Sequence, residues 1–239
     1  MRVLVVLFLT ISLGFSNFKF SNESRSLQNT TVQKTEIKNE IYDPIEGYNR
    51  VMTAVNLAFY DYVMYPVSYA YDFVMPDPIQ GAISNFFDNL IYPIRLINNL
   101  LQGKFENSWN ETKRFFINTT VGFAGFSDAA TMHFDMPKFN EDFGQTLGSW
   151  GVGDGFYIVW PILGPSSLRD SVGLVGDYFT NPISYIDDDT AKIYINIGKD
   201  INEESLHPGA KKQALEGKND AYIFIRDSYL QKRRFEISR

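Results

Sequence analysis

Apolar residues recur at intervals of three and four positions through most of residues 41–235, which predicts a body built mainly from helices. The first such segment is IEGYNRVMTAVNLAFYDYVMYPV, and we expect it to end at Pro66, because proline cannot continue the hydrogen-bond pattern of a helix. The apolar positions with this spacing are Val51, Val55, Ala58, Phe59 and Tyr62.

Three segments that follow have the same spacing and carry signals for helix ends. The first, DPIQGAISNFFDNLIYP, is predicted to have Asp77 as its N-cap and Pro78 in its first turn, and to stop at Pro93. The second, IRLINNLLQG, ends on Gly103, and glycine is common just beyond a helix C-terminus. The third, KFENSWNETKRFFINTTVG, ends near Gly122.

The next part of the body is less regular. Residues 124–155 are rich in glycine and are predicted to form loops, whereas the apolar run FYIVWPIL is either a short strand or a buried piece of helix. Ser167 and Asp170 have the spacing of a capping box, which predicts a helix to about Phe179. Asp189 is expected to cap the helix that follows.

The last segment, NDAYIFIRDSYLQKRRFEI, predicts a C-terminal helix whose apolar face excludes its cationic residues. The runs KKQ (211–213) and QKRR (231–234) are accordingly interpreted as solvated helix faces. The expected apolar face contains Tyr222, Ile225, Tyr229 and Phe235, and the residues expected outside it are Arg226, Lys232 and Arg233.

The first 40 residues differ from this body. MRVLVVLFLTISLGFS has an early Arg2, an apolar run and then small residues, so residues 1–16 are predicted to be a secretory signal peptide. The alternative is an uncleaved anchor, but a helix over Val3–Phe15 would be only about 20 Å long, against roughly 30 Å for a hydrocarbon core. Residues 17–40 are polar and predict a flexible tether, which leaves residues 41–236 as one helical domain.

Several of the predicted helices are apolar on more than one side. Phe, Tyr and Trp together reach 15% of the chain. Two arrangements account for this: central helices of a soluble bundle, or helices that contact lipid, where aromatic rings collect at the boundary with water. The adjacent apolar pairs are Phe86 and Phe87, Leu100 and Leu101, and Phe115 and Phe116.

Charge and composition argue against several classes of function. The formal net charge of −6 and the pI of about 5.0 argue against a nucleic-acid partner, because phosphate contacts need clustered Lys and Arg. The absence of cysteine excludes disulfides, thiolate metal sites and cysteine nucleophiles. Of the two histidines, His133 and His207, we interpret His133 as a loop residue rather than a metal ligand.

Nucleotide-binding and catalytic motifs are missing. GVGDG does not have the glycine spacing of GxGxxG, no GxxxxGK[ST] is present, and GPSS differs from GxSxG. The acidic run at 187–189 does not have the spacing of a calcium-binding loop. The sequence therefore predicts a protein that is not an enzyme and that uses no metal or cofactor.

Long ordered motifs resemble the MlaA/VacJ family of outer-membrane lipid-asymmetry proteins. They are IYDPIEGYNR, GAISNFFDNL, LLQGKFENSWNETKRFFINTTVGFAGFSDAA, EDFGQTLGSWGVGDGFYIVWPILGPSSLRDSVG and the terminal AYIFIRDSYLQKRRF, which span residues 41–235. The resemblance implies an all-α, compact, ring-like helical bundle that encloses an amphipathic channel and has a glycine-rich hinge loop. Family members usually carry a lipidated cysteine, and this sequence has none.

The resemblance also implies a function and a location. Family members lie on the periplasmic face of the outer membrane of Gram-negative bacteria, in its inner leaflet, beside trimeric porins. They remove phospholipids that have strayed into the outer leaflet and pass them to a soluble periplasmic lipid carrier. The alternative that we keep is a porin-associated scaffold or permeability modulator that moves no lipid, and phospholipid that co-purifies with the protein would distinguish the two.

The resemblance places the channel and hinge in two segments. Gly151 and Gly153 match the family's hinge, although glycine runs are more often tight turns, here leading into a buried strand. Asn56 falls where the family keeps an asparagine near the channel, and the other interpretation is a helix surface residue. The further residues expected at the channel are Gly155, Phe156, Tyr157, Trp160 and Leu57.

Charged and polar residues near these segments have two interpretations each. Those ahead of the first helix form either an N-terminal cap with an exposed ion pair or a polar rim that contacts lipid headgroups. Arg169 and Asp170 form either a local cap pair or a part of the channel. The residues ahead of the first helix are Asp43, Glu46, Asn49 and Arg50.

Overall fold

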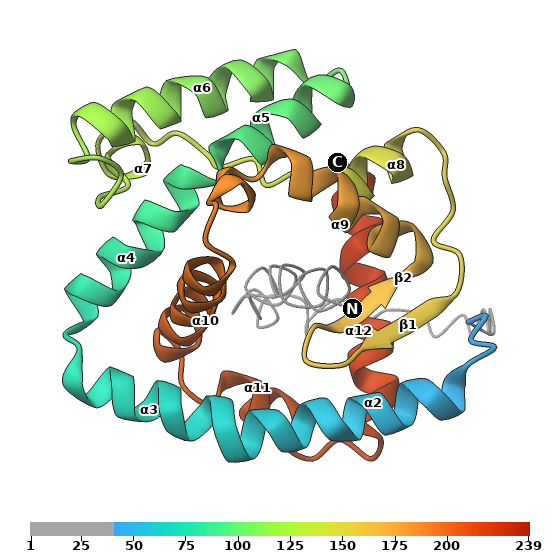
Figure 1. Cartoon of the computed structure of the whole chain (residues 1–239). Helices are drawn as coiled ribbons and strands as arrows, with labels where there is room; N and C mark the ends of the chain where they lie inside the picture. The colour runs from blue at the N-terminus through green and yellow to red at the C-terminus, as the bar shows by residue number, and fades with distance from the viewer. Residues whose placement is uncertain (1–40) are drawn as a thin grey trace, which may run out of the picture.

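The computed structural model describes residues 41–239, so the predicted signal peptide (1–16) and tether (17–40) lie outside the described residues. The helices follow one another around a ring (Figure 1), which confirms the predicted all-α, ring-like fold. The elements are α2 (Glu46–Phe59), η4 (Tyr60–Met64), α3 (Tyr65–Val74), α4 (Asp77–Leu90), α5 (Tyr92–Leu101), α6 (Phe105–Thr120), α7 (Ala129–Phe134), α8 (Phe143–Ser149), β1 (Tyr157–Trp160), β2 (Gly164–Ser167), α9 (Leu168–Thr180), η5 (Pro182–Tyr185), α10 (Asp189–Ser205), α11 (Ala210–Leu215) and α12 (Ala221–Ile237).

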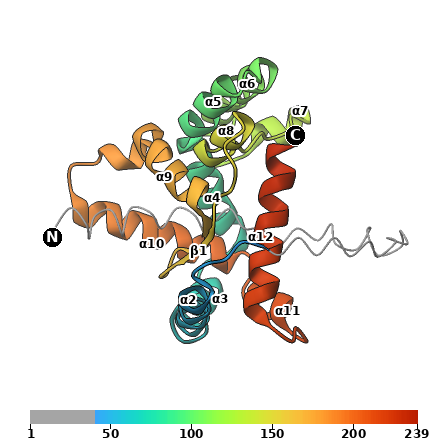
Figure 2. The ribbon, with the colours of Figure 1, turned by 90° about the vertical axis from the view of Figure 1, so that its right-hand side faces the viewer.

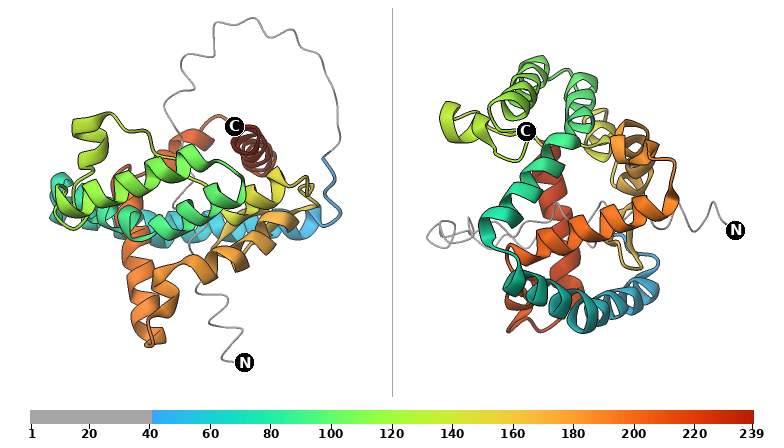
Figure 3. Two further views of the ribbon diagram at one scale, coloured as in Figure 1. Left: turned by 90° about the horizontal axis from the view of Figure 1, so that it is seen from above. Right: turned by 60° about the vertical axis from the view of Figure 1, so that its left-hand side comes forward.

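The sides of the ring are formed in chain order. In Figure 1, α2 and α3 form one side, α4 the next, α5 and α6 the third, and α8, α9 and the β1–β2 hairpin the fourth. Helix α12 crosses one face of the ring, and the first residues of α10 lie at the opposite face (Figure 2). The same separation is seen from above (Figure 3, left).

The first side of the ring is one continuous rod, so the expectation that Pro66 ends the helix was wrong. Between α2 and α3 the chain makes a π-turn, in which the N–H of Tyr65 donates to the carbonyl of Tyr60, five residues earlier. A proline ring normally clashes with the carbonyl four residues before it. The wider π-turn displaces that carbonyl, and Pro66 fits in the first turn of α3.

Two predicted caps were wrong by one residue. Pro76 is the N-cap of α4, and Asp77 is already helical. The side chain of Asp188, not of Asp189, caps α10 by accepting from the N–H groups of Thr190 and Ala191. Adjacent acidic or turn residues offer equivalent caps, so composition alone cannot choose between them.

Residues 124–155 are not all loop, which corrects another expectation. They contain α7 and α8, whose N-caps are the side chains of Asp128 and Asp142. Each helix is at most seven residues long, too short for a hydrophobic period to reveal.

Other signals for element boundaries were correct. Gly103 has a φ of 73° and ends α5 in a Schellman motif, in which its N–H donates to Leu100 and that of Lys104 donates to Asn99. Ser167 caps α9, since its hydroxyl oxygen accepts from the Asp170 N–H at 3.1 Å. The apolar run FYIVWPIL contributes a strand, β1, which pairs antiparallel with β2.

Polar side chains fill the contacts between helices, which is the reverse of a water-soluble bundle. Among the described residues 26 polar or charged residues are buried, against nine apolar ones, while 34 large apolar side chains are exposed. Soluble proteins bury chiefly apolar residues, and polar contacts between helices with apolar surfaces outside are typical of proteins in lipid. The distribution favours the lipid-contacting alternative.

The polar contacts join helices that are distant in the sequence. Helix α10 is held to α4 by the hydroxyl of Ser205, which donates to the Gln80 side chain at 2.7 Å, and by the Asn202 amide, which donates to the Gln80 carbonyl at 3.0 Å. Helix α5 is held to α6 by the buried ion pair of Arg95 and Glu111, at 2.6 Å. Within residues 41–239, no helix combines the length and the apolar character needed to cross a membrane.

One apolar cluster lies beneath the hairpin, between β1, α2 and α12. It consists of Tyr157, Val159, Tyr222 and Leu230, against which Ile41, Met52 and Tyr229 pack. The expected apolar face of α12 is therefore right for Tyr222 and Tyr229. It is wrong for Phe235, which is 60% exposed.

Arg233 is the largest departure from the sequence prediction. It was expected on a solvated face, but its side chain is only 10% exposed. Its guanidinium donates to Asp142 at 2.6 and 2.8 Å and to Asp170 at 2.9 and 3.0 Å, so one side chain joins α12 to the start of α8 and to α9. The sequence pattern assigns charges to the surface, and these partners lie 63 and 91 residues away.

We predict that Arg233→Ala destabilises the fold by about 3–5 kcal/mol, because it leaves Asp142 without its cation and removes one of the two guanidinium partners of the buried Asp170. Arg234→Ala, which removes the same charge from a side chain that is 64% exposed, is the matched control and should cost at most about 1 kcal/mol. Urea unfolding in mild detergent, followed by circular dichroism, measures both. Equal losses in the two variants would contradict the role given to Arg233.

Candidate functional site

The β1–β2 hairpin lies beside α2, and its turn points toward the middle of the ring (Figure 1). The glycine-rich segment 148–155 leads into β1 from α8. This part of the ring contains the residues that the sequence singled out for the hinge and channel.

Two asparagines on one face of α2 hold the hairpin. The Asn49 amide donates to the Tyr157 carbonyl at 2.9 Å and accepts from the Val159 N–H at 2.8 Å. Seven residues later, the Asn56 amide donates to the Trp160 carbonyl at 2.9 Å and accepts from the Ile162 N–H at 2.6 Å. Each carboxamide takes the place of a peptide group in a neighbouring strand, so α2 satisfies the open edge of β1.

Of the residues expected ahead of the first helix, Asp43 precedes α2, whereas Glu46, Asn49 and Arg50 lie in its first two turns; Asp43 and Asn49 form a buried pair, and Glu46 and Arg50 an exposed ion pair. The N-cap of α2 is Ile45, with no side-chain hydrogen bond. The Asp43 carboxylate accepts from the Asn49 amide at 2.8 Å and from the Tyr222 hydroxyl, so it connects α2 to α12. Arg50 is partly exposed and pairs with Glu46 at 2.7 Å and with Asp220 at 2.8 Å.

The glycines of the expected hinge have different roles. Gly151 has a φ of 89° and ends α8 in a second Schellman motif, with its N–H donating to Gly148 and that of Val152 donating to Leu147. Gly155 has a φ of 70°, and a Cβ there would lie 2.8 Å from Leu168. Gly153 has no positive φ, and a Cβ there would meet no atom within 4 Å.

Two anchors bound the segment around Gly153. On one side the indole N–H of Trp150 donates to the Leu101 carbonyl at 3.1 Å. On the other side the Asp154 carboxylate accepts from Arg169 at 2.6 Å and from Arg234 at 3.3 Å. Between these anchors the N–H groups of Gly151 and Val152 are held by the Schellman motif, which leaves Gly153 as the residue without such a contact.

Arg169 and Asp170 are neighbours in the network around Arg233. Arg169 is buried and donates to Asp170 at 2.9 Å, while the Tyr229 hydroxyl donates to the other oxygen of Asp170 at 2.7 Å. The interpretation as a local pair is thus correct in part, and the pair also connects α9 to α12. Sequence reasoning missed the partners Asp142, Asp154 and Tyr229, because a single acidic or aromatic residue carries no signal of a remote contact.

The apolar residues expected at the channel are divided between core and surface. Tyr157 belongs to the apolar cluster and is 1% exposed. Phe156, Trp160 and Leu57 are partly exposed, and the Trp160 indole donates to the Ser171 hydroxyl at 2.9 Å. The tip of the hairpin bears Ile162, which is 55% exposed and has a φ of 66°.

Comparison with known families and structures decides the identity. Residues 41–236 match the family described as "MlaA lipoprotein". The chain belongs to the MlaA family. A solved structure described as "Structural basis for maintenance of bacterial outer membrane lipid asymmetry" superimposes with a TM-score of 0.72 at 31% identity, covering 82% of this chain and 99% of that one.

Characterised members of the MlaA family are similar over most of their length. The "Intermembrane phospholipid transport system lipoprotein MlaA" of Escherichia coli K12 is 34% identical over 200 residues, which cover 81% of this chain and 77% of that protein. The protein of the same description from Haemophilus influenzae is 30% identical over 209 residues, covering 85% and 82%. Unlike a cysteine-lipidated protein, the 239 residues here contain no cysteine.

Two carboxyl groups of α9 differ in charge within this MlaA-family fold. Burial opposes ionisation of Asp170. The positive charge and hydrogen bonds of Arg233, together with the hydrogen bond from Tyr229, outweigh this effect and lower the pKa of Asp170 to about 2. Burial and the nearby Asp142 raise the pKa of Asp177 to about 8, although its oxygen accepts from the Phe143 N–H and the Asn98 amide. At neutral pH Asp170 is ionised and Asp177 is protonated.

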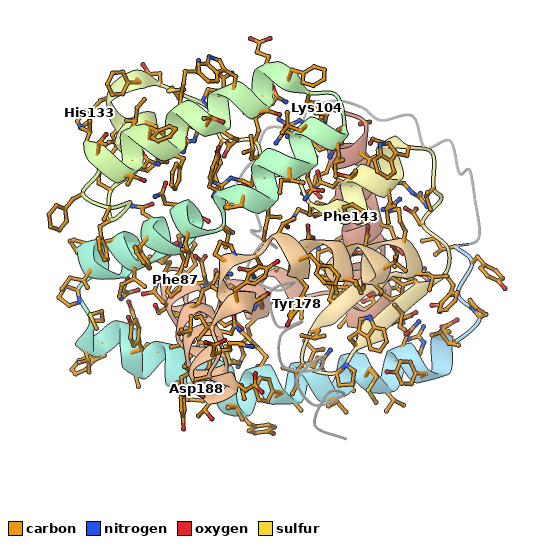
Figure 4. The ribbon with its side chains drawn as sticks, turned by 45° about the horizontal axis from the view of Figure 1, so that its top comes forward. Phe87, Lys104, His133, Phe143, Tyr178 and Asp188 are labelled. Carbon is orange, nitrogen blue, oxygen red and sulfur yellow. The ribbon has the colours of Figure 1, made fainter. Side chains whose placement is uncertain are left out.

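No group of three or more His, Asp or Glu side chains that could hold a metal ion occurs within residues 41–239. His133 was expected in a loop, but it lies in the last turn of α7, at the outer edge of the ring (Figure 4). It is distant from the hairpin, so it takes no part in the site described here.

Asn56→Ala should free the tip of the hairpin and leave its strands in place. We expect amide hydrogen exchange at Ile162 to accelerate about tenfold or more, because its hydrogen bond to Asn56 is lost. The Val159 amide, which Asn49 holds, is the internal control and should exchange as before. Unchanged exchange at Ile162, measured by mass spectrometry, would contradict the clamp.

Asp177→Asn should change how stability depends on pH. Between about pH 4 and pH 8 the folded protein retains a proton on Asp177 that the unfolded chain releases, so the free energy of unfolding falls as the pH rises. The variant lacks this pH dependence. Its free energy of unfolding, relative to that of the wild type, should therefore rise by up to about 1.4 kcal/mol per pH unit across that range.

Urea unfolding at several pH values measures this gain. Burial raises the pKa of Asp200 to about 7, and because that carboxyl stays in both proteins, the difference between them isolates Asp177. Asp187→Asn, at an exposed position, removes the same acid and should leave the pH profile unchanged. A difference between Asp177→Asn and wild type that does not vary with pH would refute the assignment.

Proposed function

We propose that this protein is a phospholipid conduit of the outer membrane. It takes phospholipids that have strayed into the outer leaflet, lets them pass through an amphipathic channel in the ring, and delivers them to a soluble periplasmic lipid carrier. It lies in the inner leaflet, on the periplasmic face of the outer membrane of a Gram-negative bacterium, beside a trimeric porin. The proposal rests on family membership and on the distribution of apolar surface.

The physical difficulty of the task is the cost of exposing lipid chains to water. A phospholipid with about 30 chain methylenes would cost on the order of 24 kcal/mol to strip into water, at about 0.8 kcal/mol per methylene. A protein can lower this barrier only by offering apolar surface along the route. The headgroup, in turn, needs polar groups along the same route.

The exposed apolar side chains supply such surface, and this single observation carries the proposal. They form stripes along the α2–α3 rod, α6 and α9, on helices whose polar faces are buried against other helices. A water-soluble scaffold gains nothing from this arrangement. The stripes contain Val51, Val55, Tyr62, Tyr69 and Phe73 on the rod, Phe105, Trp109 and Phe116 on α6, and Leu168, Val172, Val175 and Phe179 on α9.

We assign the movement of the hinge loop to Gly153. Gly151 has a fixed role as the stop of α8, and its N–H is hydrogen-bonded, so a proline there would break the helix end as well as stiffen the loop. Gly153 lies in open space between the anchors at Trp150 and Asp154. Phe156 and Trp160 border the route, and Asn56 with Leu57 holds its α2 side.

The residues expected at a polar rim are divided by their burial. Asn49, Arg169 and Asp170 are buried, so they position the hairpin and α9 and do not meet headgroups. Asp43 is tied into the same network. Arg50 is partly exposed and is the rim residue that we propose to contact headgroups.

Gly153→Pro tests the conduit against the scaffold. In cells that depend on this protein, we expect the variant to leave several-fold more phospholipid in the outer leaflet than wild type, as measured by digestion with an added lipase that cannot cross the membrane. Gly153→Ala is the control and should behave as wild type, because a Cβ there meets nothing. A Gly153→Pro protein that folds, reaches the membrane and clears lipid normally would contradict the hinge, and clearance that no channel variant affects would favour the porin-associated scaffold.

A further inference from the structure

Charge is divided unevenly along the described chain. Residues 41–209 carry nine Lys and Arg against 21 Asp and Glu, whereas residues 210–239 carry eight against four. The chain as a whole is acidic, so its last 30 residues, which form α11 and α12, are an isolated basic segment. Repulsion between like charges within the chain does not by itself produce such a separation. The separation therefore points to a partner that is attracted by the basic segment.

The fold places this basic segment on one face of the ring. Helices α11 and α12 both lie on the same side (Figure 2), and the view from above gives the same placement (Figure 3, left). At the opposite face, the exposed run Asp187–Asp189 precedes α10, and the labelled Asp188 lies at its start (Figure 4). The exposed basic residues of α11 and α12 and the acidic run at 187–189 therefore lie on opposite faces of the ring.

Several cations of the α11–α12 face are exposed to solvent. Lys212, Lys218, Arg234 and Arg239 are all exposed; Lys212 lies on α11, Lys218 in the turn that follows it, and Arg234 and Arg239 at the C-terminal end of α12. Arg233 is buried against Asp142 and Asp170, and Lys211, Arg226 and Lys232 pair with nearby carboxylates, so these four contribute less to this face. Lysine and arginine near an anionic surface each gain about fivefold in binding at low salt.

Exposed apolar side chains on α12 indicate which kind of partner the basic segment binds. Ile223 and Phe235 are 39% and 60% exposed on the same helix, and the guanidinium of Arg239 lies 5.2 Å from the centre of the Phe235 ring. Cations beside exposed apolar residues on one helix are typical of helices that lie at the headgroup level of a membrane.

We propose that the α11–α12 face binds the anionic headgroups of a phospholipid surface and so sets which face of the ring meets the membrane boundary. The acidic run at 187–189 is repelled by the same surface and reinforces the orientation. This function is separate from transport, since it requires neither the hinge loop nor a channel. It gives the protein an electrostatic means of retention at a membrane.

Flotation of the full chain with lipid vesicles tests the binding. We expect partition onto vesicles with one quarter phosphatidylglycerol to exceed partition onto phosphatidylcholine vesicles about tenfold at low salt, and the excess to vanish in high salt. The triple variant Lys212→Gln, Lys218→Gln, Arg239→Gln should lose most of this excess. Lys113→Gln on α6 is the control that changes charge elsewhere, and should retain it.

Single labels test the orientation, because the chain has no cysteine of its own. A fluorophore on Ser238→Cys, beside α12, should be quenched by spin-labelled headgroups in the anionic vesicles, and one on Asp187→Cys should be quenched several-fold less. Equal partition onto the two vesicle types, a triple variant that keeps the full excess, or equal quenching of both labels would each overturn the proposal. If the triple variant keeps its vesicle preference but no longer binds an acidic protein, the α11–α12 face would be assigned to a protein partner instead. Neither assay measures lipid transport, so their failure leaves the conduit proposal standing.

Discussion

The ring depends on paired polar groups at several of the contacts between its helices. Its large apolar side chains point outward in many places, so hydrophobic burial between helices cannot supply most of the cohesion. Hydrogen bonds and ion pairs take this role, at Gln80 between α4 and α10 and at Arg95 with Glu111 between α5 and α6. An unpaired group at such a contact would cost its full desolvation energy, so the side chains that pair there are strongly constrained.

Arg233 shows how this constraint positions the site. By binding Asp142 and Asp170 together, it joins the helix that precedes the glycine segment to the helix that follows the hairpin. Asn49 and Asn56 fasten the other side of the hairpin to α2. The segment between these fixed points contains Gly153, where a Cβ would meet no atom within 4 Å, and we propose that the loop moves there.

Sequence reasoning found the long helices because their apolar spacing extends over three or more turns, and it found Gly103 because glycine has a physical role beyond a helix end. It missed α7 and α8, which are too short to show a period, and it ended a helix at Pro66 because a π-turn leaves no local signal. At the site, the hinge and channel residues that the resemblance implies stay predictions. The resemblance could not assign Gly151 as a helix stop or Arg233 as a buried link, since those roles arise from contacts between residues far apart in the chain.

The central claim is that the ring, with its outward apolar surface, exists to carry phospholipid. Native mass spectrometry of the protein, extracted in mild detergent and washed extensively, tests this most directly. The account predicts mass additions that match intact phospholipids, in wild type and in Lys113→Gln alike. A protein that keeps its fold and is free of phospholipid under these conditions would contradict the account.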